Sequence, residues 1–344
     1  MKAKYTKFSE QKANFTLIMA PPGWGKTSLI IDLLEKSPAN RVWVFISPLR
    51  ALSEEFHERV NSQFRSWFIG STQEGNEKIK SFRLPQIIIL SPEVLQNHWI
   101  EKLLEKKEVG FIIDEVHLFF KWGETFRPKL LDSFYEILSL NLPVIALSAT
   151  VSDSLKEEIK KMVNDNKGNF EELNFGNFEF MNPPKRELSF GSNDTNKVNR
   201  LFLRMVLKKS RKRFLLFCKT REEVNNWLLI FQQRKISAIG AVGGEVKSFR
   251  ENLLKQPDVK VIISTSVLGH GVNLPSLDFL FINYHVADYG LWLQMASRAG
   301  RRGEDFCLIS CKHLKGIKGV KNKLKTGLID YYFQFDTFFE RITG

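Results

Sequence analysis

A glycine-rich run near the start of the chain has the residue types that hold a phosphate chain. The run Ala20-Pro21-Pro22-Gly23-Trp24-Gly25-Lys26-Thr27-Ser28 lies between an apolar segment and a helical pattern. Its glycines let backbone N–H groups turn inward where a Cβ would obstruct the approach. Lys26 supplies a positive charge for the β- and γ-phosphates, the Thr27 hydroxyl is a ligand for Mg²⁺, and the helix start adds its dipole. We therefore predict that residues 22–28 bind ATP.

Two carboxylates follow a second apolar segment, Phe111-Ile112-Ile113. Asp114 is a candidate to hold Mg²⁺ through water, and Glu115 is a candidate to orient and deprotonate an attacking water. An exposed acidic turn would be the commoner explanation for such a pair on its own. Because a phosphate loop lies upstream, the pair predicts hydrolysis of the bound triphosphate.

The elements that must position these residues alternate between short apolar strands and amphipathic helices. Strands that are apolar on both faces are typical of a parallel sheet covered by helices on both sides. In such a sheet, ligands bind at the carboxyl ends of the strands, which the glycine-rich run and the acidic pair follow. The strands that we expect in the first half are Phe15–Ala20, Val42–Ile46, Ile87–Leu90, Phe111–Ile113 and Val144–Leu147.

Two adjacent prolines, Pro183 and Pro184, interrupt this pattern and predict a linker. The chain of 344 residues is long enough for two domains of about 150 residues each. We predict an α/β protein with one domain over residues 1–181, a second over residues 182–311, and a basic and aromatic tail over residues 312–344. The strands expected in the second domain are Phe214–Cys218, Val259–Ile263, Phe279–Ile282 and Phe306–Ile309.

The composition narrows the class of protein. Lys and Arg number 51 against 38 Asp and Glu, so the net charge of +13 favours a polyanion partner such as nucleic acid. With 43% hydrophobic and 26% charged residues, the chain is globular rather than disordered. No apolar stretch approaches the ~18 residues needed to cross a bilayer, and three cysteines are too few for a disulfide framework or a four-cysteine zinc site. We expect a cytoplasmic protein, nucleoid-associated if prokaryotic, with no membrane partner.

Together with the two segments above, further runs occur in the order found in superfamily 2 helicases, which the chain resembles over residues 10–310. This resemblance implies two tandem RecA-like parallel-sheet domains with an ATP cleft between them. It also implies ATP hydrolysis coupled to movement on nucleic acid. The further runs are Ser47–Leu52, Ser91–Glu93, Ser148–Thr150, Leu216–Glu222, Ser264–Pro275 and Gln294–Arg301.

By this resemblance, several residues outside the first two segments also act on ATP. Gln294 orients water or contacts the γ-phosphate, and Arg298 and Arg301 stabilise the charge of the transition state, an effect worth roughly 10³–10⁵ in rate. Gly271 also belongs to the nucleotide site. Gln11 is similar to the glutamine of the Q motif, which hydrogen-bonds adenine, although a polar residue entering the first strand explains it equally well.

The resemblance further implies that a nucleic-acid strand lies across both domains. Phosphate contacts hold a strand without reading its bases, so binding should fall as salt rises. The run Lys121–Pro128 is similar to the aromatic-rich loop of RecQ helicases, and side chains of this loop would stack on bases. The alternative is that Trp122 and Phe126 simply pack under the sheet. The candidate phosphate contacts are Ser47, Arg50, Ser91, Thr220 and Thr265, and the stacking candidates are Trp122, Phe126 and Arg127.

The first half is RecQ-like, whereas Gly271–Pro275 and Gln294-Met295 are more similar to Ski-type DExH helicases. We expect an ATP-dependent DNA helicase that uses Mg²⁺ and moves 3′-to-5′ on single-stranded or duplex DNA. An RNA helicase or RNP remodeller is the alternative within the enzymes, and so is a nucleic-acid-stimulated ATPase that translocates without unwinding. A non-hydrolysing nucleic-acid-binding adaptor is disfavoured, because Lys26, Glu115 and Arg301 are all present. The sequence predicts no particular protein partner.

Overall fold

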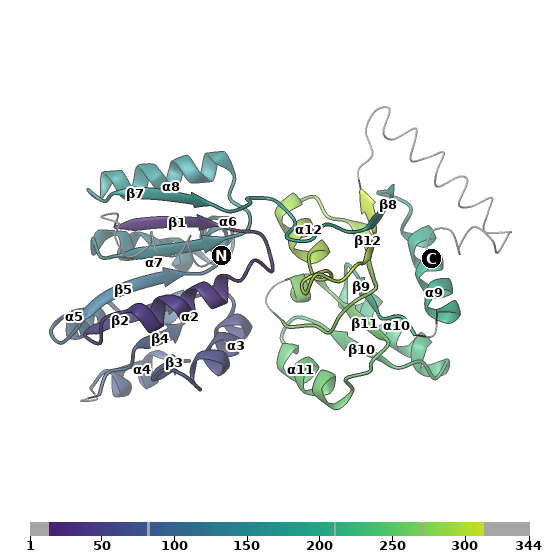
Figure 1. Ribbon diagram of the computed structural model, residues 1–344, viewed down its shortest axis with the longest axis horizontal. Helices are drawn as coiled ribbons and strands as arrows, with labels where there is room; N and C mark the ends of the chain where they lie inside the picture. The colour runs from purple at the N-terminus through teal and green to yellow at the C-terminus, as the bar shows by residue number, and fades with distance from the viewer. Residues whose placement is uncertain (1–13, 81–82, 210, 270–271, 313–344) are drawn as a thin grey trace. The chain divides into compact units, whose positions relative to one another are not determined.

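A computed structural model describes residues 14–80, 83–209, 211–269 and 272–312 (Figure 1). Its residue contacts separate the chain between Met181 and Asn182 into two compact units, and each is described here by itself. Within the described residues, no helix is long and apolar enough to cross a membrane.

The first unit is a seven-stranded sheet in the order β3-β4-β2-β5-β6-β1-β7, and every neighbouring pair is parallel. Parallel neighbours need crossover connections, and helices supply most of them. The strands are β1 (Phe15–Met19), β2 (Arg41–Ile46), β3 (Ser66–Ile69), β4 (Ile87–Leu90), β5 (Glu108–Ile113), β6 (Val144–Ser148) and β7 (Phe170–Asn174). The helices are α2 (Lys26–Lys36), α3 (Arg50–Val60), α4 (Thr72–Lys78), the short 3₁₀ helix η2 (Pro92–Val94), α5 (Asn97–Leu104), α6 (Val116–Gly123), α7 (Pro128–Ser139) and α8 (Asp153–Asp165).

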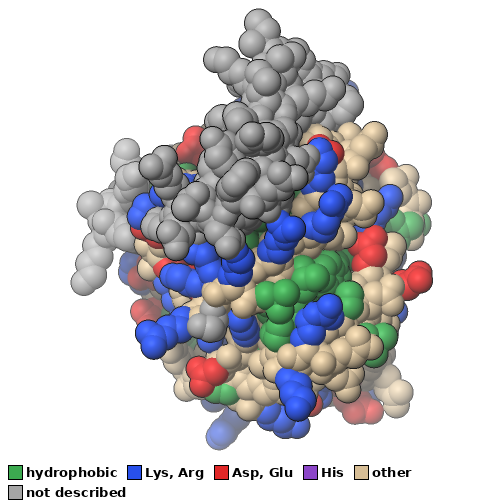
Figure 2. Space-filling model, turned by 90° about the vertical axis from the view of Figure 1, so that its right-hand side faces the viewer, with side chains coloured by type: hydrophobic (Ala, Val, Ile, Leu, Met, Phe, Trp, Pro, Cys, Tyr) green, Lys and Arg blue, Asp and Glu red, His purple; other side chains and the backbone are tan. Residues whose placement is uncertain are grey.

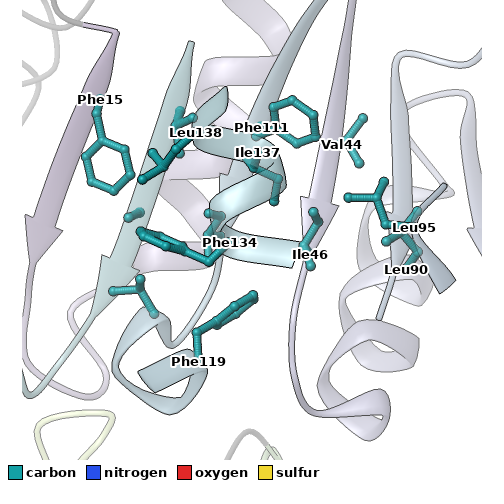
Figure 3. Packing of buried hydrophobic residues seen from close by; sticks show 14 of the residues in the cluster. Phe15, Val44, Ile46, Leu90, Leu95, Phe111, Phe119, Phe134, Ile137 and Leu138 are labelled. Carbon is teal, nitrogen blue, oxygen red and sulfur yellow. The ribbon is translucent and has the colours of Figure 1, made fainter. Parts of the chain in front are cut away.

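Each central strand of this sheet buries both of its faces. In β2, Val44 and Ile46 belong to one core cluster, whereas Trp43 and Phe45 belong to another. The first cluster includes Phe134 of α7 and other residues of α5–α8, as Figure 3 shows in part, and the second includes residues of α2 and α3. Burial of one such large apolar side chain stabilises the fold by about 1.5–3 kcal/mol. Helices therefore cover both sides of the sheet, and the sheet's carboxyl edge is left for ligands.

The second unit is a six-stranded parallel sheet in the order β10-β11-β9-β12-β13-β8. Its core gathers aromatic rings, among them Phe202, Phe214 and Phe281. The prediction of two parallel-sheet α/β domains is confirmed. The strands are β8 (Arg186–Gly191), β9 (Phe214–Phe217), β10 (Ala238–Ala241), β11 (Val261–Ser264), β12 (Phe279–His285) and β13 (Cys307–Lys312). The helices are α9 (Thr195–Lys208), α10 (Arg221–Gln233), α11 (Val246–Lys255), the 3₁₀ helix η3 (Ser266–Gly269) and α12 (Tyr289–Ala296).

The structure contains strands that the sequence patterns did not predict, namely β3, β7, β8 and β10. These are the two edge strands of each sheet. An edge strand has a neighbour on one side only, and these strands carry more partly exposed residues than the central ones. β7 and β8 also carry several polar side chains. The continuous apolar run that marks a central strand is therefore missing from them.

Candidate functional site

The glycine-rich run forms an open loop between β1 and α2. Gly23 and Gly25 have φ angles of 85° and 104°, a left-handed conformation that residues with a side chain rarely adopt. A Cβ built on Gly25 would have no atom within 4 Å, so open space lies beside the loop. Among the residues that the structure describes, no side chain caps the start of α2, and no acidic residue lies in its first turn. Its backbone N–H groups are thus available to an anion.

The side chains of this loop differ in their exposure and in their contacts with the rest of the protein. The Lys26 ammonium donates a hydrogen bond to the carbonyl of Ala20 at 3.2 Å, which folds the side chain back over the loop. Thr27 is partly exposed and Ser28 is exposed, whereas Pro22 is buried. The Trp24 ring stacks on Phe175 with 4.7 Å between ring centroids, so its contact is with the protein. The loop can therefore offer an ammonium and a hydroxyl to a phosphate chain.

The acidic pair lies directly after β5. The Asp114 N–H donates to the carbonyl of Ile46 at 2.9 Å, which fixes the backbone at the end of the sheet. Glu115 has φ 50° and ψ 49°, a left-handed conformation that is uncommon for a residue with a long side chain and that stores backbone strain. Glu115 directly precedes α6, and its carboxylate lies beside His117.

Electrostatics connect the acidic pair to the phosphate loop. Burial, and then the charge of Glu115, raise the pKa of Asp114 to about 7, while the Lys26 ammonium acts in the opposite direction. Two carboxylates and one ammonium therefore interact at the same edge of the sheet. Additional positive charge there would favour the ionised form of Asp114.

The donor set at this edge fits Mg²⁺. Asp114 offers a carboxylate and Thr27 offers a hydroxyl, and both are oxygen donors of the kind that Mg²⁺ prefers. Within the described residues, no group of three or more His, Cys, Asp and Glu side chains could hold a metal by itself. A Mg²⁺ ion that is also bound by substrate phosphates and waters needs no such group.

A polar chain extends from Glu115 into the segment that follows β6. The Glu115 carboxylate lies 3.4 Å from Nδ1 of His117, and both side chains are only 13% exposed. The same nitrogen lies 2.8 Å from Oγ of Ser148, which in turn accepts a hydrogen bond from the N–H of Thr150 at 3.1 Å. The residues Ser148–Thr150 are thus connected to the acidic pair.

The residues predicted to contact nucleic acid in the first unit differ in exposure. Arg50 is exposed at the start of α3 and pairs with Glu54 at 3.0 Å. Ser91 is partly buried before η2. Ser47 is fully buried, and its hydroxyl accepts a hydrogen bond from the N–H of Leu49 at 3.4 Å. In this conformation Arg50 is the side chain available to a phosphate, and Ser47 supports the turn that presents it.

The aromatic-rich run begins in the last turn of α6, continues as a turn over residues 124–126, and ends at the start of α7. Trp122 lies in the last turn of α6, because the buried residues around it continue the apolar face of that helix. The Trp122 ring is partly buried against the core, whereas Phe126 is 65% exposed. Their ring centroids are 5.6 Å apart. The exposed ring is therefore Phe126, and the Trp122 ring packs between it and the core.

Arg127 connects several of the predicted segments. Its guanidinium forms an ion pair with Glu93, donates to the carbonyl of Pro48 at 2.7 Å, and lies 5.5 Å from the centre of the Trp122 ring. These contacts engage the guanidinium within the protein. Arg127 therefore joins the segments around Pro48, Glu93 and Trp122.

In the second unit, Gln294 and Arg298 are buried, each 3% exposed, whereas Arg301 is partly exposed. Arg298 donates to the carbonyl of Val272 at 3.0 Å, and Arg301 donates to the carbonyl of Ser297 at 3.2 Å. Arg298 thus holds the run 264–275 in place within its own unit. Of the two arginines, Arg301 is the more accessible to a ligand.

The remaining predicted residues have structural contacts or lie outside the described part of the chain. Thr220 is exposed, and its hydroxyl caps α10 by accepting from the N–H of Glu223 at 3.1 Å. Thr265 is partly exposed, and its N–H donates to the carbonyl of Ala241 at 3.1 Å. Gln11, Gly271 and all but the first residue of the tail 312–344 lie outside the described residues.

One segment that the sequence did not single out also contacts this site. The residues Asn174-Phe175-Gly176-Asn177-Phe178 turn after β7 and stack on the phosphate loop through Phe175. Asn and Gly at such spacing are a turn signal. They do not reveal which distant segments the turn will meet.

Family models match both units of the chain. The description DEAD/DEAH box helicase applies to residues 6–158, and Helicase conserved C-terminal domain applies to residues 196–303. The chain belongs to the superfamily 2 helicases.

Curated relatives agree with this assignment of a helicase core, and solved structures share its fold. ATP-dependent DNA helicase RecQ of Bacillus subtilis is 24% identical over 312 residues, which cover 86% of this chain and 50% of that protein. A structure of S. cerevisiae Dbp5 bound to RNA and ADP BeF3 matches with a TM-score of 0.67 and 18% identity, over 92% of this chain and 83% of the other. A structure of Mycobacterium smegmatis helicase Lhr bound to ssDNA and AMP-PNP has a TM-score of 0.66 and 19% identity, over 91% of this chain and 45% of the other. The helicase core spans about half the length of the curated relatives that it matches.

Proposed function

We propose that this helicase core hydrolyses ATP and uses the energy to move on nucleic acid, with single-stranded DNA as the favoured track. The observation that supports this most directly is the edge of the first sheet, where an open phosphate loop and a partly buried acidic pair interact. A chain that only binds nucleic acid has no need of a strained Glu115 beside the triphosphate loop.

The roles of the residues follow from their chemistry. The Lys26 ammonium leaves the Ala20 carbonyl and binds the β- and γ-phosphates, while the N–H groups at the start of α2 hold their oxygens. Glu115 orients the attacking water and accepts its proton. Thr27 and Asp114 would hold Mg²⁺, which when bound would neutralise charge on the phosphates.

His117 keeps the Glu115 carboxylate in one orientation through the contact at 3.4 Å. Arg301 is the proposed arginine that stabilises the transition-state charge on the γ-phosphoryl group, because its side chain is partly exposed whereas Arg298 is buried. Arg298 holds Val272 in place through its hydrogen bond, and the proposed role of Gln294 is to orient water or contact the γ-phosphate.

DNA is preferred over RNA because RecQ helicases recur among the relatives in sequence. Dbp5 was solved with RNA and Lhr with ssDNA, and both share this fold at under 20% identity, so structural likeness alone favours neither. The polarity of 3′-to-5′ is part of this proposal and follows the RecQ resemblance. RNA remodelling and translocation without unwinding are the other activities that the same site would support.

The test is ATP hydrolysis by the full chain with no nucleic acid, with single-stranded DNA, and with RNA of the same sequence. We expect turnover that depends on Mg²⁺ and that DNA stimulates more than RNA. A strand-displacement assay on a duplex with a 3′ overhang then separates unwinding from translocation. Equal turnover under all three conditions would overturn the proposal.

A further inference from the structure

The turn after β7 holds the phosphate loop through contacts on one side. The N–H of Phe175 donates to the carbonyl of Met19 at 2.7 Å, and the Phe175 ring stacks on Trp24. Gly176 has φ 127°, and a Cβ on it would come within 3.2 Å of the Pro21 ring. The positive φ and the close approach to Pro21 therefore both favour glycine at this position.

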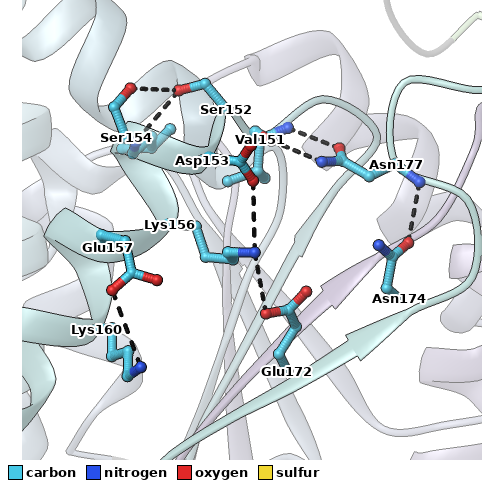
Figure 4. A network of polar contacts seen from close by, with 11 residues as sticks. Val151, Ser152, Asp153, Ser154, Lys156, Glu157, Lys160, Glu172, Asn174 and Asn177 are labelled. Atoms are coloured by element: carbon cyan, nitrogen blue, oxygen red, sulfur yellow. Dashed lines mark hydrogen bonds and ion pairs between the residues drawn. The ribbon is translucent and has the colours of Figure 1, made fainter.

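The same turn holds the segment after β6 through contacts on its other side. The N–H of Phe178 donates to the carbonyl of Ala149 at 3.0 Å. The Asn177 side chain makes two hydrogen bonds to the backbone of Val151: it donates to the carbonyl at 2.6 Å and accepts from the N–H at 2.9 Å (Figure 4). Asn174 accepts from two N–H groups of the turn, each at 3.0 Å, and so rigidifies it.

These contacts form a continuous path from the phosphate loop to the acidic pair. Val151 follows Thr150, whose N–H is bound by Ser148, and Ser148 contacts His117 beside Glu115. Thr150 is 4% exposed, and its hydroxyl oxygen has no hydrogen-bond partner within the described residues. The backbone around Thr150 is therefore held by Ser148 on one side and by Asn177 on the other.

We propose that Asn177 is a positioning residue for ATP hydrolysis, which fixes the segment Ser148–Val151 relative to the phosphate loop and thereby sets the orientation of Glu115. The inference rests on the proposed function, because it assigns a role within the same site. Asn177 does not touch the nucleotide; it acts through Val151. Small displacements of a positioned group lower the rate of the chemical step while binding is retained.

The experiment compares Asn177→Ala with the conservative Asn177→Asp in ATPase assays of the full chain. Asn177→Ala removes both hydrogen bonds to Val151. We expect kcat at saturating single-stranded DNA to fall about tenfold, which is about 1.4 kcal/mol of transition-state stabilisation. KM for ATP should stay within about twofold. Asn177→Asp keeps the acceptor for the Val151 N–H and should fall between Asn177→Ala and the wild type.

Lys156→Ala is the matched control, because it removes the ion pairs of Lys156 with Glu172 and Asp153 in the same region (Figure 4). Its kcat should equal that of the wild type. The double variant Asn177→Ala with Ser148→Ala should lose little more than the larger of the two single losses, since both act through one segment. The inference is overturned if kcat of both Asn177 variants equals that of the wild type, if Lys156→Ala loses as much, or if the two losses multiply.

Circular dichroism and thermal melting establish that each variant is folded at the assay temperature. If Asn177→Ala is not folded there, Asn177→Asp decides the outcome by its kcat alone. If no nucleic acid stimulates the wild type, the proposed function fails, and the role of Asn177 is then judged on basal turnover.

Discussion

At the scale of single residues, the site depends on a few residues whose backbone adopts an unusual conformation. Gly25 at φ 104° and Glu115 at φ 50° both lie in the left-handed region. For glycine this conformation has no steric cost, whereas for Glu115 it stores strain. In this conformation the Glu115 carboxylate lies next to His117. Asp114 interacts electrostatically with both Glu115 and Lys26.

Substitution of Lys26 or Glu115 should abolish turnover for different reasons. Lys26→Ala removes the charge that holds the β- and γ-phosphates, so affinity for ATP should fall as well as kcat. Glu115→Gln keeps the shape but cannot accept a proton, so kcat should fall about 10²–10⁴-fold with nucleotide binding retained. Steady-state ATPase assays and binding of a fluorescent ATP analogue separate the two. A Glu115→Gln protein that keeps more than a tenth of wild-type turnover would contradict the role of Glu115 as base.

At the scale of elements, the aromatic-rich run shows how a helix end can present one ring and hide another. Trp122 packs against the core from the last turn of α6, and Phe126 is exposed just beyond it. Arg127 binds the run to Pro48 and Glu93. A nucleic-acid strand that stacks on Phe126 would therefore contact a segment that is bonded to the predicted contact regions around Pro48 and Glu93.

Phe126→Ala should lower stimulation by single-stranded DNA more than basal hydrolysis, because one base-stacking contact is worth about 1–3 kcal/mol. Its melting temperature should remain that of the wild type, since the ring is 65% exposed. Trp122→Ala should lower stimulation too and also destabilise the fold, by up to about 3–5 kcal/mol. Thermal melting together with DNA-titrated ATPase assays checks both. Unchanged stimulation in Phe126→Ala would show that the exposed ring is not part of the DNA path.

At the scale of the whole molecule, the charge of the chain is spread over both units. Figure 2 shows lysine and arginine side chains gathered around apolar ones on one face of the second unit, and the exposed Arg200, Arg204 and Lys208 of α9 lie in that unit. Binding of a polyanion through such contacts weakens as salt rises.

Arg301→Ala tests whether the second unit contributes to the chemistry at the first. The variant should lower kcat by roughly 10³–10⁵-fold if Arg301 stabilises the γ-phosphoryl charge in the transition state. Nucleotide binding should change much less, because Lys26 and the N–H groups of α2 remain. Arg302→Ala is the control, since Arg302 is exposed next to it and has no assigned role. Equal losses in the two variants would indicate a general charge effect instead.

The sequence by itself was sufficient to predict the central strands of both sheets and to locate the segments that follow them. Those strands are buried on both faces, so their composition alone marks them, and the phosphate loop requires glycine wherever it occurs. The edge strands escaped prediction because one neighbour is missing and polar residues are tolerated there.

Only the tertiary structure decided which predicted side chains face solvent and which distant segments touch. Ser47 and Arg298 are buried, Phe126 is exposed, and the turn at Asn177 meets both Val151 and the loop that contains Trp24. Burial and contact of this kind depend on residues far apart in the chain that the packing of helices on a sheet brings together. Local patterns of residue type therefore do not predict which distant residues will be in contact.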